Sequence, residues 1–491
     1  STGFMDRVDR IMRLFAGYRG AHGTHGMPTA SRGVKKEIKK SATTVREPVT
    51  RELWEKHLSG ERPLGIISIN EENMCCWGCI DVDKYDIDHA EIVKKVDKLP
   101  LVVCRTKSGG AHAFLFVREP TPAEEMRTAL QSLAASLGWG ESEIFPKQTQ
   151  VLKERGDIGN WLNMPYLGGD ETERYCVKKS GLAMSLSEFL SFAEEKQIAD
   201  LSNVSVTVTE ELSDGPPCLQ HLTSTGFPEG TRNNGLFALG IYCKKKYGEN
   251  WRDRLEEMNQ KYMVPPLTSD EVVAVQRSLE KKDYNYSCRD QPLCSFCESA
   301  VCRTRKFGVG TAGQYPEISG LSKLETDPPI WFLDIEGNRV ELDTSELQEY
   351  RRFQKACMEQ VTIYFMPIRA DTWASMVGSA MEHAVIIEAP REMSVYGHFL
   401  ELLESFCRDR HRGQRWQDIH DGRPFFDEET GAHWFRLRDF TALLDREGFR
   451  AWGRNKIGKE LKQIGGQKGK NIEGRFVNLF YVPDSVFEQD A

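Results

Sequence analysis

The sequence predicts an α/β domain, followed by an α-helical domain and a C-terminal region that again mixes helices and strands. Three observations lead to this architecture. Residues 51–205 alternate short apolar runs with amphipathic stretches, residues 218–285 keep a helical period, and residues 396–491 return to mixed periodicity. A chain of 491 residues is too long for one ordinary core, so two to four domains are expected.

The expected elements follow from period and from turn residues. In the α/β domain the strands are 64–69, 78–83, 101–105, 112–117 and 142–145, and the helices are 87–98 and 122–137. The helical domain has helices over 234–247, 251–262 and 269–281, the last opened by the good helix start Thr268-Ser269-Asp270-Glu271. Five segments result: 1–50, 51–205, 218–307, 310–395 and 396–491.

The remaining segments are an N-terminal region, a linker and a connecting region. Residues 1–50 are basic, with a short helix over 4–15 and a loop through 17–33, in which His22 and His25 are expected to be loop histidines. Residues 202–217 form a linker or edge strand. The connecting region 310–395 mixes strands over 330–342 with helices over 345–360 and 371–383.

Composition limits the class of protein. Hydrophobic residues make up 40% and charged residues 28% of the chain, which is typical of a soluble globular protein. No apolar run approaches the roughly 18 residues of a membrane span, and no signal-peptide pattern opens the chain, so we expect no membrane partner and a cytoplasmic location. A net charge of −8 argues against a protein coated in basic charge, but a local basic channel for nucleic acid remains compatible.

The most informative segment is Trp77-Gly78-Cys79-Ile80-Asp81-Val82-Asp83. On a strand, residues two apart point to the same face, so Asp81 and Asp83 project together. Two adjacent carboxylates repel each other unless a cation lies between them, and hard divalent ions such as Mg²⁺ accept these ligands. The alternative is a strand that ends in a solvated Asp-x-Asp turn.

Two further segments follow. Residues 105–116 read as a strand, a Gly-rich turn and a second strand, with Lys107, Ser108, Gly110 and His112 as possible phosphate contacts; the alternative is a hairpin with a core histidine. Glu143-Ile144-Phe145-Pro146-Lys147 then places one acid and one base around a short apolar strand, or forms an ordinary surface pair.

The order acid-x-acid, Ser/Gly/His, acid-apolar resembles the three motifs of the archaeo-eukaryotic primase superfamily, which includes primase-polymerases of phages, plasmids and defence islands. The resemblance covers roughly residues 50–205 and implies a mixed-sheet catalytic domain. It implies that Asp81, Asp83 and Glu143 hold two Mg²⁺ or Mn²⁺ ions and that Ser108 and His112 contact the incoming nucleotide. The family often has Asp in the third position, so Asp157 is the alternative to Glu143.

The function that this resemblance implies is template-dependent synthesis by a primase or polymerase. The partners would be single-stranded DNA template and primer, NTP or dNTP, and a separate helicase, because Gly465 to Gly469-Lys470-Asn471 lacks the spacing of a nucleotide-driven motor. Two metals fit the chemistry, and Lys107 and Lys147 could neutralise triphosphate charge. The alternative is a replication initiator or DNA-binding protein with a degenerate polymerase domain; a nicking enzyme would need a His-x-His motif, which the sequence lacks.

Thirteen cysteines without a secretory signal favour metal binding over disulfides. Cys288, Cys294, Cys297 and Cys302 could close a compact zinc site. The run Gly215-Pro216-Pro217-Cys218, with the helices that follow, resembles instead the iron–sulfur domain of the primase large subunit. That resemblance implies Cys218, Cys288, Cys297 and Cys302 as ligands of a [4Fe–4S] cluster and leaves Cys294 spare.

The C-terminal residues predict a nucleic-acid-binding surface. A strand at 433–438, helices over 439–447 and 456–463, a Gly-Lys-rich tip at 465–469 and a strand at 476–482 resemble a winged helix in their order. Positive charge concentrates on the second helix and wing, where phosphate contact would require it. The predicted DNA-binding residues are Lys456, Lys459, Lys462, Lys468, Lys470 and Arg475. A protein-interaction domain with solvated lysines is the alternative.

Overall fold

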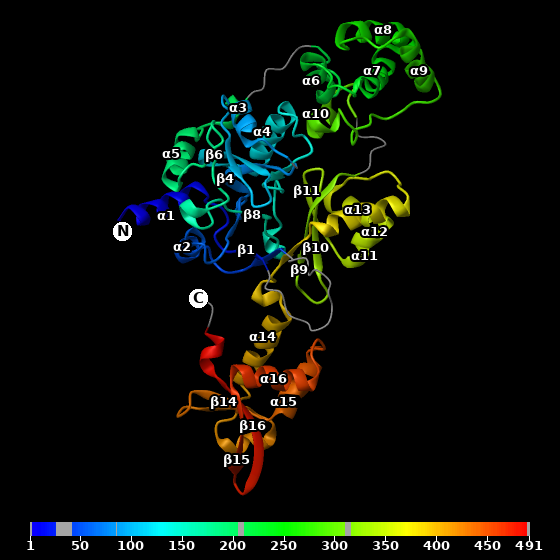
Figure 1. Cartoon of the computed structure of the whole chain (residues 1–491). Helices are drawn as coiled ribbons and strands as arrows, with labels where there is room; N and C mark the ends of the chain where they lie inside the picture. Colours follow the sequence, from blue (N-terminus) through cyan, green and yellow to red (C-terminus); the bar gives the residue numbers. More distant parts are fainter. Residues whose placement is uncertain (1, 26–41, 85, 205–210, 310–315, 489–491) are drawn as a thin grey trace, which may run out of the picture. The chain divides into compact units, whose positions relative to one another are not determined.

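The computed structural model describes residues 2–25, 42–84, 86–204, 211–309 and 316–488. The chain divides into two compact units, Ser1–Leu324 with Ile330–Glu388 and Glu325–Pro329 with Ala389–Ala491. The first unit therefore groups the α/β domain, the helical domain and most of the connecting region (Figure 1). Within the described part of the chain, no helix has the length and apolar character needed to cross a membrane.

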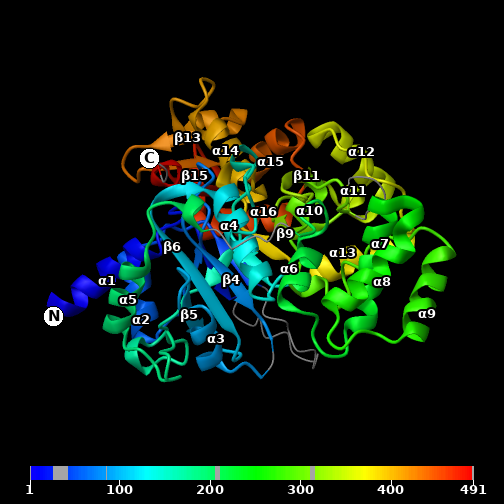
Figure 2. The same ribbon diagram turned by 90° about the horizontal axis from the view of Figure 1, so that it is seen from above.

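A four-stranded antiparallel sheet forms the first part of the α/β domain. Its order is β5–β6–β4–β7, and Figure 2 shows β5, β6 and β4 side by side. The strands are β4 (Met74–Val82), β5 (Val102–Arg105), β6 (Ala111–Pro122) and β7 (Glu143–Phe145). All four overlap the strands that the apolar alternation predicts, although β4 already begins at Met74 and β6 continues to Pro122. Each strand has buried residues, and each contacts a neighbouring helix.

The helices of this domain share one core with the sheet. They are α1 (Thr2–Leu14), α2 (Arg51–Ser59), α3 (His89–Lys95), α4 (Ala123–Ser136) and α5 (Leu186–Lys196). Phe15, directly after α1, lies 6.1 Å from the Trp54 ring, 5.5 Å from the Trp77 ring and 5.2 Å from the Phe114 ring. Val8 and Ile11 of α1 are fully buried in the same core. The N-terminal helix is thus an integral part of the α/β domain.

An eight-stranded mixed sheet joins segments that are far apart in the sequence. Its order is β11–β10–β9–β12–β2–β1–β3–β8. The strands are β1 (His22–His25), β2 (Ala42–Val45), β3 (Gly65–Ile67), β8 (Trp161–Asn163), β9 (Ile318–Leu324), β10 (Ile330–Ile335), β11 (Asn338–Leu342) and β12 (Val385–Ile387). β12 runs parallel to both β2 and β9, and the other pairs are antiparallel. The connecting region and the α/β domain therefore share one sheet.

The expectation that residues 17–33 form a loop is wrong for residues 22–25. These residues form β1, and His22 is buried, with Nδ1 2.9 Å from the carbonyl oxygen of Glu47. Gly23 faces the Trp161 ring so closely that a Cβ would lie 1.9 Å from it, which explains a glycine in this strand. The rest of that expected loop, residues 26–33, lies outside the described residues.

The remaining helices of the first unit lie in two groups. The connecting region has α11 (Thr344–Gln348), α12 (Tyr350–Val361) and α13 (Ala370–Glu382); the single helix expected over 345–360 is broken at Glu349. The helical domain has α6 (Pro217–Thr225), α7 (Arg232–Tyr247), α8 (Trp251–Tyr262), α9 (Ser269–Glu280) and α10 (Ser299–Thr304). The α9 helix begins at the expected helix start with a capping box, in which Thr268 and Glu271 exchange hydrogen bonds.

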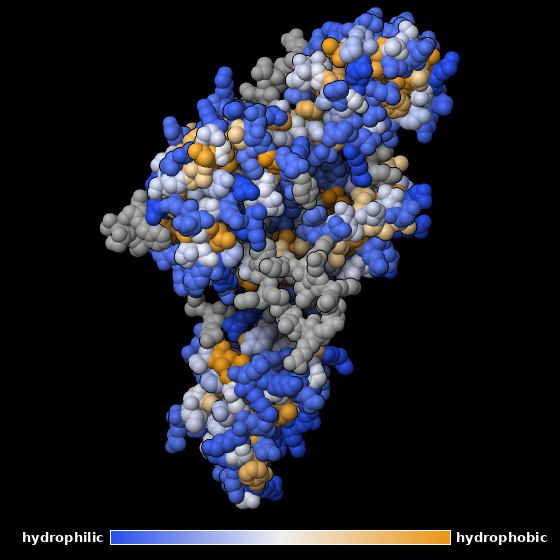
Figure 3. Space-filling model, viewed as in Figure 1, coloured by the Kyte–Doolittle hydropathy of each residue, from blue (hydrophilic) through white to orange (hydrophobic). Residues whose placement is uncertain are grey.

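The second unit surrounds a four-stranded sheet in the order β13–β14–β16–β15. Its elements are α14 (Val395–Arg408), β13 (Phe425–Asp427), β14 (Ala432–Phe435), α15 (Leu437–Arg446), α16 (Arg454–Ile464), β15 (Gly466–Ile472) and β16 (Arg475–Pro483). The Gly-Lys-rich tip expected at 465–469 is wrong, because residues 466–472 form β15 and the turn lies at Glu473–Gly474. The surface in Figure 3 is mostly hydrophilic, as the charged composition predicts.

Candidate active site

Three predicted site residues lie opposite one another on three adjacent strands. In the antiparallel registers Asp81 of β4 pairs with His112 of β6 on one side and with Glu143 of β7 on the other. Residues directly opposite each other in such a ladder project to the same face of the sheet. His112 Nε2 lies 3.3 Å from Asp81 Oδ1. The two side chains are 13% and 26% exposed, so this face is open to a ligand.

The predicted Gly-rich turn lies at the same end of this sheet as Asp83. Asp83 directly follows β4 and is exposed, and the turn over residues 106–110 joins β5 to β6. Gly110 packs so closely on the end of β4 that a Cβ would lie 2.9 Å from the carbonyl oxygen of Val82. A side chain at this position would push the turn away from the carboxylate strand. Lys107 and Ser108 are located on this turn.

Glu143 and Lys147 form a local pair beside Asp81. Lys147 Nζ lies 3.2 Å from Glu143 Oε1 and 5.3 Å from the centroid of the Phe145 ring. The lysine side chain is 13% exposed, whereas that of Glu143 is 49% exposed. The carboxylate is therefore accessible, and a cationic group is held beside it.

Asp157, the alternative third carboxylate, lies elsewhere. Its side chain is completely buried, and its two oxygens lie 2.9 and 3.0 Å from Nε and Nη2 of Arg339. Its Oδ2 also accepts a hydrogen bond from the Leu152 backbone N–H. A carboxylate with both oxygens engaged in this way is less suited than Glu143 to join Asp81 in binding a cation.

The carboxylate set has the donor chemistry that divalent cations prefer. Carboxylate oxygens are hard ligands, and Mg²⁺ commonly uses one or two of them together with substrate phosphates. In the structure, Asp81 contacts His112 and Glu143 contacts Lys147. Within the described ranges, no three His, Cys, Asp or Glu side chains are grouped as ligands of one metal ion. The residues fit a metal–nucleotide complex in chemistry and in placement on one face.

A cleft of about 760 Å³ begins at Glu143 and Lys147. It is bounded by α4, by Arg289 and α10 of the helical domain, and by the connecting region. The cations in its lining are Arg127, Lys147, Arg289 and Arg303, and the acids are Glu124, Glu141, Glu143, Glu317 and Glu336. The cleft therefore places polar groups from three segments next to the carboxylate face.

Four of the five candidate cysteine ligands line one small cavity. Cys218, Cys288, Cys297 and Cys302 surround about 40 Å³, together with Pro216, Pro217 and Tyr286. Burial, and then the proximity of the other three thiols, raises the pKa of Cys218 well above its ordinary value. The backbone N–H of Val309 donates a hydrogen bond to Cys302 Sγ at 3.2 Å. The structure thus brings Cys218 to the other three, although about 70 residues separate it from them in sequence.

Cys294 is not part of this group. It lies on a short 3-10 turn, Cys294–Phe296, and is absent from the residues that line the cavity. Burial and a hydrogen bond with Glu141 raise the pKa of Cys294 to about 11. This thiol lies beside Glu141 of the α/β domain, whereas the other four candidates line the cavity.

Only some of the predicted DNA-binding residues of the second unit line a common groove. Lys459 and Lys462 line a groove of about 630 Å³ formed by α15, α16 and the β15–β16 hairpin. Lys456 instead pairs with Glu460 at 2.9 Å, and Lys470 Nζ lies 3.3 Å from the centroid of the Trp416 ring. Lys468 and Arg475 are exposed on the hairpin.

Sequence reasoning missed part of the same groove. Arg436 and Arg438 contribute to its lining, beside Arg454 of the basic second helix and the polar side chains of Asn455, Gln467 and Asn478. The strand expected over 433–438 ends at Phe435, so that Arg436 and Arg438 lie instead at the start of α15, near α16. The signal that could have found them is the dense positive charge of residues 436–462 as a whole.

One comparison with known proteins covers the segment that contains the carboxylate strands. Residues 16–184 match the family model described as the archaeo-eukaryotic primase domain of the TOTE conflict system. No curated protein matches the chain. The matched segment contains β4, β6 and β7, and with them Asp81, His112 and Glu143. Residues 16–184 therefore form a domain of the archaeo-eukaryotic primase superfamily, whose members are nucleotidyltransferase-type enzymes.

Proposed function

We propose that the protein is a template-dependent DNA primase or polymerase, which transfers nucleotides from NTP or dNTP onto an initiating nucleotide or a primer 3′-hydroxyl. One observation carries the proposal. Asp81 lies between His112 and Glu143 on three adjacent strands, inside a domain of the primase superfamily. A domain without polymerase activity would not require these three side chains on one open face.

The residues have complementary roles in this proposal. Asp81, Asp83 and Glu143 would hold two Mg²⁺ or Mn²⁺ ions, which when bound supply charge stabilisation for the attacking and leaving oxygens. Lys107, Ser108 and the backbone at Gly110 would donate to the triphosphate from the turn beside Asp83. His112 would orient the nucleotide, and Lys147 would offset negative charge that develops on the phosphates.

The four gathered cysteines support a structural metal site in the helical domain. We propose Cys218, Cys288, Cys297 and Cys302 as the ligands, because they alone among the candidate cysteines line the shared cavity. The group would be Zn²⁺ or a [4Fe–4S] cluster, both of which thiolates bind. Cys218 lies at the start of α6, so this ligand would connect the start of the helical domain to its end.

The second unit would hold nucleic acid. Its order of one helix, two strands, two helices and a hairpin supports a winged-helix-like domain. The groove with Arg436, Arg438, Arg454, Lys459 and Lys462 is a concentration of positive charge in a chain of net charge −8. Phosphate contacts of this kind supply sequence-independent affinity for a template strand.

The test uses the full chain with labelled nucleotides. We expect incorporation on primed single-stranded DNA with Mg²⁺ or Mn²⁺, and none without a divalent ion. Unprimed template in a parallel reaction separates primer synthesis from extension, and NTP and dNTP are supplied separately. Binding of the template without incorporation under every condition would point instead to a replication initiator or DNA-binding protein with a degenerate polymerase domain.

A further inference from the structure

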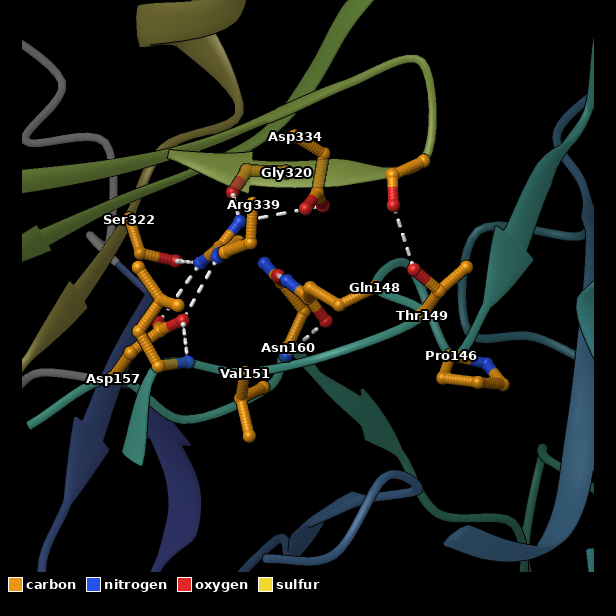
Figure 4. Close-up of polar contacts among 12 residues, drawn as sticks. Pro146, Gln148, Thr149, Val151, Asp157, Asn160, Gly320, Ser322, Asp334 and Arg339 are labelled. Atoms are coloured by element: carbon orange, nitrogen blue, oxygen red, sulfur yellow. Dashed lines mark hydrogen bonds and ion pairs between the residues drawn. The ribbon is translucent and has the colours of Figure 1, made fainter. Parts of the chain in front are cut away.

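One buried arginine of the connecting region contacts a buried acid of the α/β domain. Arg339 of β11 has a side chain with no solvent exposure, and its guanidinium contacts both oxygens of Asp157 at 2.9 and 3.0 Å. The same group donates to the Gly320 carbonyl at 2.7 Å and to Ser322 Oγ at 3.2 Å (Figure 4). A planar guanidinium with this many partners fixes the relative position of the two segments that it joins.

A second acid completes the cluster from the side of the connecting region. Asp334 Oδ2 lies 3.3 Å from Arg339 Nη1, and the carboxyl group is almost fully buried. Gly320 has φ +59, and a Cβ there would lie 2.3 Å from Asp334 Oδ2. The glycine therefore leaves space for the acid and the arginine, as Figure 4 shows. The two acids therefore both interact with the charge of Arg339.

Hydrogen bonds connect Asp157 to the segment that follows Glu143 and carries Lys147. Asp157 Oδ2 accepts from Leu152 N, and Val151 N donates to Asn73 Oδ1 at 3.0 Å. Thr149 Oγ1 donates to the carbonyl of Gly337 at 2.8 Å. The segment 146–160 is thus held by Asn73, directly before β4, on one side and by the connecting region on the other. It closely follows Glu143 and carries Lys147.

The other side of β7 is held by α4 close to the same cluster. Arg127 Nη1 donates to the carbonyls of Ile144 and Pro146 at 3.3 and 2.7 Å. Asp334 lies close enough to act on the charge of Arg127. The backbone of β7 and of the segment after it therefore depends on two arginines that share one buried acid as neighbour.

We propose that residues 317–324 and 330–388 are a functional part of the catalytic unit, and that Arg339 is a positioning residue that fixes Glu143 and Lys147 through Asp157 and the segment 146–160. The shared eight-stranded sheet supports this reading, because β12 lies between β2 of the α/β domain and β9 of the connecting region. The inference rests on the proposed function for its kinetic consequence, but its structural consequence is independent of catalysis.

The test compares a buried and an exposed link between the same two segments. Arg339→Lys keeps the charge but cannot make the two-pronged interaction with Asp157. The control is Arg155→Ala, which breaks the pair of Arg155 with Glu341, in which the arginine is 52% exposed. Three measurements are made on the full chain: amide hydrogen exchange over residues 143–160, a titration for Mn²⁺ affinity, and the kinetics of primed extension (kcat and KM) below the unfolding temperature.

In Arg339→Lys we expect exchange over 143–160 to rise at least tenfold, with exchange over 232–262 unchanged. Mn²⁺ affinity should weaken severalfold and kcat should fall, while KM for DNA stays near the wild-type value. Arg155→Ala should behave as wild type in all three measurements. A folded Arg339→Lys protein with wild-type exchange and Mn²⁺ affinity would overturn the proposal.

A second variant covers the case in which Arg339→Lys does not fold. Thr149→Val removes one hydrogen bond to Gly337 and leaves the buried charges intact. The same exchange and Mn²⁺ measurements are made on this variant, and we expect exchange over 143–160 to rise and Mn²⁺ affinity to weaken, both by less than in Arg339→Lys. Unchanged exchange and Mn²⁺ affinity would overturn the proposal. If the wild-type protein incorporates no nucleotide, the proposed function fails. The exchange measurement still decides whether the connecting region positions 143–160.

Discussion

Asp81 and Glu143 lie directly opposite each other on β4 and β7, in the register of an antiparallel pair. A shift of one residue in either strand would turn one of the two carboxylates to the other face of the sheet. The buried neighbours Ile80 and Ile144 oppose such a shift, because they would then lose their places in the core. The hydrophobic pattern of the two strands thus fixes the relative position of the acids.

Replacement of both Asp81 and Asp83 by Ala is expected to abolish nucleotide incorporation and leave the fold intact. The loss should be on the order of a thousandfold or more, since metal-held charge is worth several kcal/mol at the transition state. Asp81 pairs with the partly exposed His112, and Asp83 is exposed, so neither supports the core. Incorporation assays and circular dichroism measure the two effects. The exposed Glu91→Ala is the control, and a folded, active double variant contradicts the assignment.

His112→Ala is expected to weaken nucleotide affinity and to leave DNA affinity unchanged. A hydrogen bond to a charged phosphate is worth about 1.5–3 kcal/mol, so an affinity loss of roughly ten- to a hundredfold is expected. Titrations with nucleotide and with single-stranded DNA measure the two affinities separately. Equal losses, or loss of the fold, would show that His112 is a packing residue against Phe114, whose ring centroid lies 5.8 Å away.

The cysteine cavity predicts opposite results for two variants. Cys218→Ser should lose the metal and destabilise the helical domain, because this ligand closes a loop of about 70 residues. Cys294→Ser should keep the metal, since Cys294 lies outside the cavity and faces Glu141. Metal analysis, absorbance near about 400 nm in protein purified without air, and thermal unfolding measure the outcome. The reverse pattern would establish the compact zinc site instead, and a wild-type protein without metal would exclude both sites.

The groove of the second unit predicts a change in salt dependence. The triple variant Arg438→Ala, Lys459→Ala and Lys462→Ala should weaken DNA binding and lower the slope of log K against log salt by about 0.7–0.9 for each phosphate that is no longer neutralised. Lys456→Ala is the matched control, since this lysine already pairs with Glu460. Fluorescence anisotropy at several salt concentrations measures both slopes. An unchanged slope in the triple variant would assign the groove to a protein partner.

The sequence is most informative where local pattern determines structure. Alternation predicts β4, β6 and β7, and the order of the motifs that carry Asp81, His112 and Glu143 indicates that these residues meet. The α9 capping box is readable from Thr268 to Glu271 because it involves only four successive residues. The superfamily of residues 16–184 is predicted from the motifs and is confirmed by the family comparison.

Long-range pairing is beyond the local pattern. β12 has only three residues, and nothing in Val385–Ile387 indicates that it lies between β2 and β9. The Arg339–Asp157 pair joins positions 182 residues apart, so neither residue stands out in its own segment. Likewise the sequence leaves Asp157 open as a metal ligand, because it does not reveal that an arginine from the connecting region neutralises this acid.

The buried Asp334 predicts that the first unit loses stability as pH rises from about 4 to 7. Burial, the largest influence, raises the pKa of Asp334 from 3.8 to about 7; Asp157 also raises it, and Arg339 and Arg127 lower it. Between these values the folded protein retains a proton that the unfolded chain has released. The free energy of unfolding should therefore fall by up to about 1.4 kcal/mol per pH unit and become level above pH 7. Asp334→Asn cannot ionise, so its stability relative to wild type should rise across this range. Urea unfolding of both proteins from about pH 4.5 to 8 measures the difference, and a difference that stays constant would show that Asp334 keeps one charge state throughout.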